Sequence, residues 1–142
     1  LYGKGKDEVI LQKMINDLGV EKKILLKGHT ANVQEALKNC HLLLQITKVD
    51  AMPLSVVEAM AMARLCIVSN VGDMPQWVQN DVNGFICKDV TIEDMDATLE
   101  ACWLQQDNWK TLGENAYQIF TEKYPQPYEE KMVELLQRYY SK

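Results

Sequence analysis

Short apolar runs alternate with stretches of helical periodicity along most of this sequence. The candidate strands, which are short and rich in aliphatic residues, are 24–26, 41–46 and 66–68. The candidate helices, in which apolar residues recur every three or four positions, are 9–18, 32–38, 54–64, 107–120 and 128–140, with one more beginning at residue 91. Strands that alternate with helices predict an α/β fold with a parallel, Rossmann-like sheet flanked by helices.

Composition and charge narrow the class of protein. Hydrophobic residues make up 47% of the 142 and charged residues 25%, and no apolar run is long enough to span a bilayer, as is typical of a soluble globular domain. The net charge of −5 argues against nucleic acid as a partner. Residues 1–64 contain nine basic and seven acidic residues, whereas residues 65–142 contain six basic and thirteen acidic residues. The first half therefore suits an anionic ligand better than the second.

The four cysteines, at positions 40, 66, 87 and 102, contain no Cys-x-x-Cys pair. Three of them lie in or beside apolar runs. This arrangement favours buried free thiols in a cytoplasmic protein over a disulfide or a metal site.

The stretch from Asp50 to Glu58, Asp-Ala-Met-Pro-Leu-Ser-Val-Val-Glu, is the strongest candidate for chemistry. It connects a predicted strand to a predicted helix, which is where open α/β sheets bind ligands. Pro53 suits the first helical position, so Asp50 precedes the helix and Glu58 lies one turn into it. The backbone amides of residues 54–56 would have no helical acceptor and would form an anion site.

This stretch resembles the Glu-x7-Glu signature of the retaining glycosyltransferases with two Rossmann domains, the GT-B class, in the family called glycosyl transferases group 1. The family form is Glu-Gly-Phe-Pro-Leu-Ser-Leu-Leu-Glu-Ala-Met-Ala-x-Gly-x-Pro-Val-Val. This chain reads, without gaps, Asp-Ala-Met-Pro-Leu-Ser-Val-Val-Glu-Ala-Met-Ala-Met-Ala-Arg-Leu-Cys-Ile from residue 50. Two further segments, 69–76 and 80–86, resemble the family's Thr-x-Val-Gly-Gly-x-Pro-Glu and Asp-Gly-x-Asn-Gly-x-Leu.

The resemblance implies that residues 1–142 form a single nucleotide-sugar-binding domain, the C-terminal half of a GT-B architecture. Its first strand, a basic pair for the diphosphate and an N-terminal acceptor-binding domain would all precede Leu1, so we expect a fragment that is inactive alone. The implied location is the cytoplasm, with contact to the inner face of the membrane through the absent domain as a further option.

The implied reaction transfers a sugar to an acceptor hydroxyl with retention, without a metal or a cofactor. The donor would be a UDP-, GDP- or ADP-linked sugar, and the acceptor a lipid-linked molecule or a growing glycan, as in polysaccharide assembly. Such a reaction needs amides or basic groups for the departing diphosphate and carboxylates to orient the sugar.

Carried over by position, the resemblance gives the two carboxylates catalytic roles. Asp50 would bind sugar hydroxyls near the reacting centre and Glu58 the ribose hydroxyls, whereas the alternative for Glu58 is a surface carboxylate favoured by the helix dipole. Pro53 starts the helix, and the amides of Leu54 and Ser55 would bind the diphosphate.

Further candidates for donor binding lie in three other turns. Gly3 and Gly5 form a Gly-x-Gly turn, which lines the diphosphate in the family but is otherwise a plain tight turn. Gly28 with His29 would lie near the base, or be an ordinary turn. A third turn, which would approach the sugar or serve only as a loop, consists of Gly72 and Asp73.

Departures from the family pattern keep other functions open. Asp50 replaces a Glu and is one methylene shorter, and Gln76 also replaces a Glu. Both departures favour a non-catalytic nucleotide-binding or interaction module of the same fold. A sugar-nucleotide epimerase of the same architecture is a third reading, which has less need of the complete Pro-Leu-Ser-x-x-Glu register.

Overall fold

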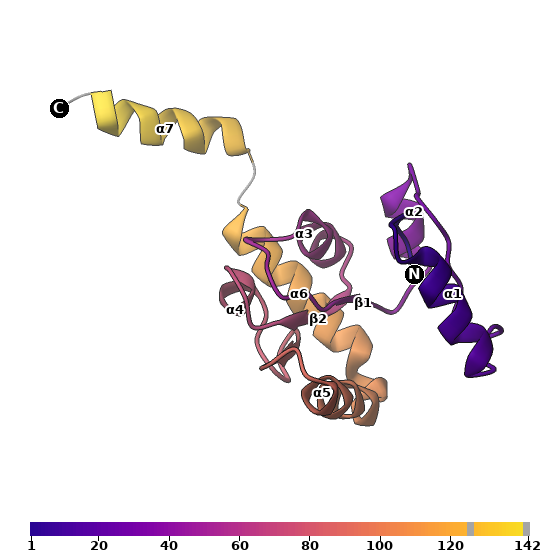
Figure 1. Cartoon of the computed structure of the whole chain (residues 1–142). Helices are drawn as coiled ribbons and strands as arrows, with labels where there is room; N and C mark the ends of the chain where they lie inside the picture. Colours follow the sequence, from indigo (N-terminus) through magenta and orange to yellow (C-terminus); the bar gives the residue numbers. More distant parts are fainter. Residues whose placement is uncertain (125–126, 141–142) are drawn as a thin grey trace. The chain divides into compact units, whose positions relative to one another are not determined.

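The computed structural model describes residues 1–124 and 127–140, and the chain divides into two compact units, Leu1–Ala36 and Leu37–Lys142. Figure 1 labels the helices and most of the strands. The helices are α1 (Glu8–Asp17), α2 (Val33–Lys38), α3 (Leu54–Ala61), α4 (Met74–Trp77), α5 (Ile92–Leu104), the 3₁₀ turn η1 (Gln106–Asn108), α6 (Trp109–Lys123) and α7 (Tyr128–Tyr140). The strands are β1 (Leu42–Gln45), β2 (Leu65–Ser69) and β3 (Gly84–Cys87). Within the described ranges, no helix is long and apolar enough to cross a membrane.

The first unit is built around α1, which confirms the helix predicted at 9–18. The strand predicted at 24–26 is wrong, because the unit has only an isolated parallel bridge between Tyr2 and Gly28. The Gly3 N–H donates to the Gly28 carbonyl at 2.7 Å. Both glycines adopt positive φ, 123° and 65°, so the backbone leaves the extended conformation there and the pairing does not continue past them. Before the bridge, residues 25 and 27 are hydrogen-bonded to Leu1 without forming a regular strand.

The second unit contains a parallel three-stranded sheet in the order β1-β2-β3, which confirms the predicted α/β fold. All five residues of the central strand β2 are buried, as expected for a parallel strand covered on both faces. The edge strand β1 is only partly buried, and Leu44 is 46% exposed. The predicted strand at 41–46 is therefore confirmed in position, although its burial is less complete than its apolar sequence suggests.

Alternate residues of β2 belong to two different hydrophobic clusters. Cys66 and Val68 pack into a cluster with Val56 and Met60 of α3 and Ala116 of α6. The other cluster joins β2 to β3, α5 and the start of α6, and its buried members are Leu65, Ile67, Phe85, Cys102 and Leu112. Helices thus cover both faces of the sheet, and Figure 1 shows α3 and α5 on opposite sides of the strands.

Two helices begin with side-chain caps at the positions where the sequence predicts a helix start. The Asn32 Oδ1 accepts the Glu35 N–H at 3.0 Å at the start of α2, and the Thr91 Oγ1 accepts the Asp94 N–H at 3.1 Å at the start of α5. The next predicted helix starts two residues later than expected, at Trp109, after the turn η1.

Candidate functional site

The loop that carries Asp50 leaves the carboxyl end of β1 and is folded against the end of β2. The Thr47 N–H donates to the Ser69 Oγ at 2.6 Å. The Thr47 hydroxyl then donates to the Val49 carbonyl at 3.1 Å and closes a small turn. Asp50 follows this turn and is half-buried.

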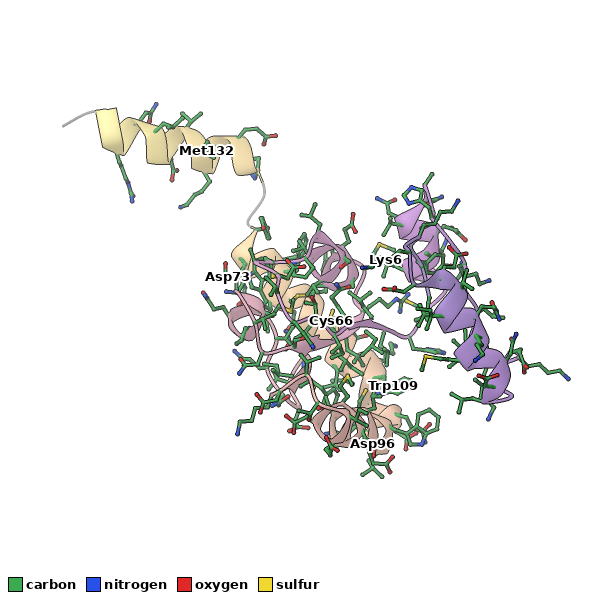
Figure 2. The ribbon with its side chains drawn as sticks, viewed as in Figure 1. Lys6, Cys66, Asp73, Asp96, Trp109 and Met132 are labelled. Atoms are coloured by element: carbon green, nitrogen blue, oxygen red, sulfur yellow. The ribbon has the colours of Figure 1, made fainter. Side chains whose placement is uncertain are left out.

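The loop after β2 meets the Asp50 loop through backbone atoms. The Asp73 N–H donates to the Ala51 carbonyl at 2.7 Å. Gly72 adopts φ 55°, and a Cβ at this position would overlap the carbonyl oxygens of Asp50 and Ala51. Gly72 is therefore required both by its conformation and by the close approach of the two chains. Figure 2 shows Asp73 at the surface of this unit, outside the interior position of Cys66.

The start of α3 differs by one position from the prediction. Pro53 is the N-cap, with φ −64° and ψ 128°, and Leu54 and Ser55 are the first two helical residues. At these positions amides have no acceptor one turn earlier, so both remain candidates for an anion site. The Val56 amide, which the sequence also suggests for this role, donates instead to the Pro53 carbonyl at 3.0 Å. The predicted set of three amides is thus reduced to two.

Glu58 is the fifth residue of α3 and is exposed, as predicted for a carboxylate one turn into the helix. The Ser55 hydroxyl donates to the Gln45 Oε1 at 3.4 Å and links the first turn of α3 to the end of β1. The second unit thus joins the Asp50 loop, the Gly72 loop and the start of α3 at the carboxyl end of the sheet. This is the edge at which parallel sheets bind ligands.

The remaining candidates, Gly3, Gly5, Gly28 and His29, lie in the first unit. A cavity of about 290 Å³ is lined in part by Gly3, Lys4 and Gly5. The Gly3 N–H donates to the Gly28 carbonyl at 2.7 Å. Gly5 and His29 are exposed. That these residues bind the donor stays a prediction.

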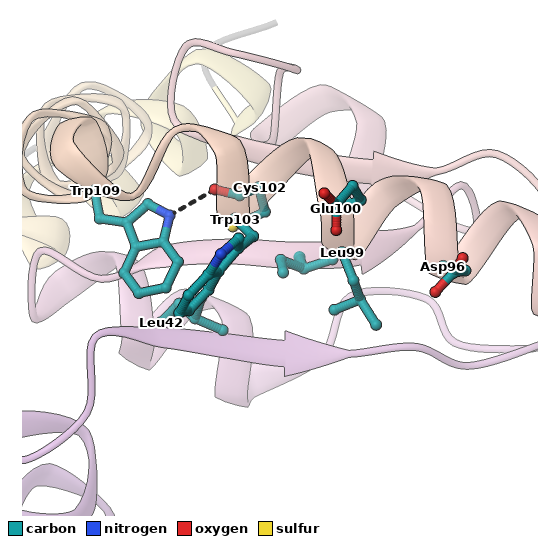
Figure 3. A pocket seen from close by; sticks show the side chains of 8 residues that line it. Leu42, Asp96, Leu99, Glu100, Cys102, Trp103 and Trp109 are labelled. Atoms are coloured by element: carbon teal, nitrogen blue, oxygen red, sulfur yellow. Dashed lines mark hydrogen bonds between the residues drawn. The ribbon is translucent and has the colours of Figure 1, made fainter.

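A second cavity of about 290 Å³ lies between β1 and α5 in the second unit, and the sequence does not predict it. Figure 3 shows Leu42 beneath Trp103 and Trp109, with Asp96 and Glu100 farther along α5. The two tryptophan rings meet edge to face at 5.9 Å between their centroids. The Trp109 Nε1 donates to the Cys102 carbonyl at 2.9 Å and fixes that ring. The cavity lies on a face of the sheet, whereas the Asp50 loop lies at its end.

The thiols confirm the prediction from the cysteine pattern. All four cysteines are free; Cys66, Cys87 and Cys102 are buried and Cys40 is half-buried. Burial, followed by the charge of the nearby Cys40, raises the pKa of the Cys66 thiol to about 12. Among residues 1–124 and 127–140, no group of three or more His, Cys, Asp or Glu side chains is placed to hold a metal ion. The metal-free reaction stays a prediction.

Ser69, at this edge of the sheet, has a structural role that the sequence does not assign. Ser69 is 0% exposed and its hydroxyl receives the Thr47 amide. The available signal is a polar residue that ends an otherwise apolar strand, since a buried hydroxyl must find a hydrogen-bond partner.

Known proteins resemble this chain along most of its length. The family model described as Glycosyl transferases group 1 matches residues 1–119. The poly(ribitol-phosphate) alpha-N-acetylglucosaminyltransferase of Staphylococcus aureus is 28% identical over 96 residues, which are 67% of this chain and 20% of that protein. The N-acetyl-alpha-D-glucosaminyl L-malate synthase of Bacillus anthracis is 30% identical over 88 residues, or 62% of this chain and 23% of that protein. An Escherichia coli UDP-Gal:alpha-D-GlcNAc-diphosphoundecaprenol alpha-1,3-galactosyltransferase is 28% identical over 85 residues, or 60% and 21%.

Solved structures show the same fold. The crystal structure of TarM matches with a TM-score of 0.81 and 25% identity, over 96% of this chain and 27% of that chain. A structure of S. aureus TarM in complex with UDP and other ligands matches with a TM-score of 0.75 and 25% identity, over 87% and 25%. Anabaena HepE in complex with UDP and glucose has a TM-score of 0.82 at 20% identity, over 97% and 40%.

This chain spans about a fifth of the length of the curated relatives that it matches. The match to the family model covers most of the 142 residues, and the three-stranded parallel sheet flanked by helices is that of GT-B glycosyltransferases. The chain belongs to the Glycosyl transferases group 1 family.

Proposed function

We propose that this chain is the donor-binding part of a retaining glycosyltransferase that moves a sugar from a UDP-linked donor to an acceptor hydroxyl. The observation that carries the proposal is the contact between the Asp50 loop and the Gly72 loop, at the carboxyl end of a parallel sheet and next to the start of α3. Ligands of open α/β sheets bind at this edge. The motif that is strongest in the sequence therefore lies where such a sheet has its site.

The roles of the residues follow from their positions. The amides of Leu54 and Ser55, at the start of an eight-residue helix, are suited to stabilise the diphosphate that leaves with the bonding electrons. The Glu58 carboxylate accepts hydrogen bonds from the two ribose hydroxyls. The Asp50 carboxylate accepts hydrogen bonds from hydroxyls of the transferred sugar near its anomeric carbon. Neither a metal ion nor a cofactor takes part in this scheme. The negative charge of the diphosphate is stabilised by amide N–H groups and by basic groups.

The choice of UDP rests on the proteins that resemble this chain. The name of the Escherichia coli relative contains UDP-Gal, and the TarM complex that matches at 25% identity contains UDP. The names of the three relatives all specify an α-linked sugar. If the donor sugar is also α-linked to its diphosphate, such a product requires retention at the anomeric carbon, and this is the mechanism that we propose.

The residues that carry this proposal do not identify the acceptor. The names of the relatives specify a poly(ribitol-phosphate), a malate and a sugar attached to diphosphoundecaprenol, each of which offers a hydroxyl group. We propose that a further domain binds the acceptor, which would be a growing glycan or a lipid-linked molecule at the inner face of the membrane.

The test is a titration of the chain with UDP, GDP and ADP, followed by NMR or calorimetry, for the wild type and for Glu58→Ala. We expect UDP to bind best and the variant to lose about tenfold in affinity, because two hydroxyl hydrogen bonds to a charged group are lost. Glu100→Ala is the matched control, since Glu100 is also an exposed helical carboxylate but lies on α5. Equal losses in both variants, or binding of none of the three nucleotides, would contradict the proposal.

A second candidate function is a nucleotide-binding module without catalysis. The Gln76 side chain, which stands where the family has a Glu, donates to the Asp73 Oδ1 at 2.9 Å, so it serves the structure of the loop. This module would bind UDP as tightly as UDP-sugars. A transferase domain should prefer the UDP-sugar, because Asp50 adds contacts with the sugar.

A further inference from the structure

We propose that Ser69 is a positioning residue for sugar recognition, because its buried hydroxyl and the neighbouring Gly72 hold the loop that presents Asp50. The proposal rests on the proposed function in one respect, the role of Asp50 toward the donor sugar. The anchoring itself follows from the contacts of the loop.

The first anchor lies where the chain leaves β1. The Ser69 side chain is fully buried at the end of β2, and its Oγ receives the Thr47 N–H at 2.6 Å. Thr47 in turn fixes Val49, because the Thr47 Oγ1 donates to the Val49 carbonyl at 3.1 Å. One hydroxyl of β2 thus determines the path of the backbone up to the residue before Asp50.

The second anchor lies just after Asp50. The Ala51 carbonyl accepts the Asp73 N–H at 2.7 Å, and Gly72 lies so close beneath that no side chain fits there. Asp50 is therefore held on one side by Ser69, the last residue of β2, and on the other by the loop that follows β2. A loop fixed at both ends keeps its central residue in a narrow range of positions, which favours recognition of one ligand geometry.

The anchoring loop is itself fixed to the third strand. The Asn70 N–H donates to the Cys87 carbonyl at 3.0 Å, and the Val71 N–H donates to the Ser69 carbonyl at 3.0 Å. The ends of β1, β2 and β3 are thus connected in series. Ser69 connects β2 to the end of β1 through its side chain and contacts the following loop through its backbone.

The Asp50 carboxylate does not contribute to either anchor. Among the hydrogen bonds within residues 1–124 and 127–140, none uses an Asp50 side-chain oxygen. The backbone of Asp50 is held while its carboxylate is left to a ligand. Removal of the Ser69 hydroxyl should therefore loosen the loop and weaken contacts with the sugar, whereas the nucleotide contacts at Glu58 and the start of α3 should persist.

The experiment compares the affinities for UDP and for UDP-N-acetylglucosamine in the wild type, Ser69→Ala, Ser69→Thr and Thr98→Val. We expect Ser69→Ala to lower the affinity for UDP-N-acetylglucosamine about 3- to 10-fold, the equivalent of one lost hydrogen bond. The affinity for UDP should change less than about twofold. Ser69→Thr keeps the hydroxyl and should retain the preference for the UDP-sugar. Thr98→Val removes a comparable hydroxyl, which donates to the Asp94 carbonyl at 2.6 Å in α5, and should change neither affinity.

Amide hydrogen exchange of the same variants tests the anchoring without a ligand. In Ser69→Ala, the amides of residues 47–51 should exchange faster, while those of α5 and α6 stay protected. Unchanged exchange at 47–51 would overturn the anchoring. Faster exchange at 47–51 with an equal loss of affinity for UDP and for UDP-N-acetylglucosamine would overturn the role of Ser69 in sugar recognition. Absence of UDP binding to the wild type would instead contradict the proposed function, and exchange at 47–51 would still decide the anchoring.

Discussion

Two of the three glycine turns that are candidates for donor binding differ in what surrounds them. In the second unit, Gly72 lies against the carbonyl oxygens of Asp50 and Ala51, with no space for a side chain. In the first unit, a Cβ at Gly3 or Gly5 would meet no atom within 4 Å. The glycine of the second unit is required by packing and by conformation. In the first unit, conformation alone requires Gly3, which has φ 123°.

This difference shows that the same residue type can have different structural importance in neighbouring motifs. The Gly72 turn connects two strand ends and fixes a candidate catalytic loop. The Gly3 turn is exposed, and the Gly3 N–H joins it to the Gly28 carbonyl. Substitutions should therefore destabilise the protein much more at Gly72 than at Gly3.

The largest effect is expected for Gly72→Ala. The new methyl group would overlap the backbone of the Asp50 loop and would stand at φ 55°. Overpacking and backbone strain together should lower the free energy of unfolding by about 2–4 kcal/mol. Urea denaturation followed by circular dichroism measures this change. A loss below about 1 kcal/mol would show that the two loops can separate freely.

A smaller effect is expected from the thiol of Cys66, which lies in β2 below the Gly72 loop. Burial raises its pKa from 9.0 to about 12, so above about pH 9 the thiol ionises in the unfolded chain but stays protonated in the folded one. Its contribution to the free energy of unfolding is complete below pH 9 and is lost as the pH rises toward 12. The loss should be about 1 kcal/mol between pH 9 and pH 10.

The measurement compares the pH dependence of urea denaturation in the wild type and in Cys66→Ala. The wild type should lose more stability between about pH 8 and pH 10 than the variant does, because lysines and tyrosines titrate equally in both. Parallel curves would mean that water reaches the interior of the sheet.

The smallest effects are expected in the first unit. Gly5→Ala should change the protection of the α1 amides by less than about 0.5 kcal/mol, since the site is open and exposed. Gly3→Ala should reduce it by about 1 kcal/mol, because only its conformation resists a side chain. Native-state hydrogen exchange measures both variants. A larger effect for Gly5 than for Gly3 would reverse the predicted order.

The sequence predicted the architecture well because apolar periodicity directly reflects burial. The parallel sheet, the helix after Asp50 and the helix starts near Asn32 and Thr91 are all confirmed. The strand predicted at 24–26 is wrong, because the pattern of apolar residues does not reveal where two glycines end the pairing. The ligand roles of Asp50 and Glu58 stay predictions.

The contacts within the candidate site were much less accessible from the sequence. No local pattern shows that the Ser69 hydroxyl receives an amide 22 residues earlier in the chain. The loss of the Val56 amide from the anion site depends on the geometry of the first helical turn. Such details depend on which loops meet in space, and residue spacing does not encode this directly.

The contacts around Asp50 have a consequence for evolution. Gly72 and Asp73 hold the loop through the carbonyl oxygens of residues 50 and 51, which every amino acid possesses. The side chains at positions 50 and 51 can therefore diverge, as Asp and Ala do from the family's Glu and Gly, while the loop keeps its shape. Single substitutions at these two positions should thus leave the fold intact.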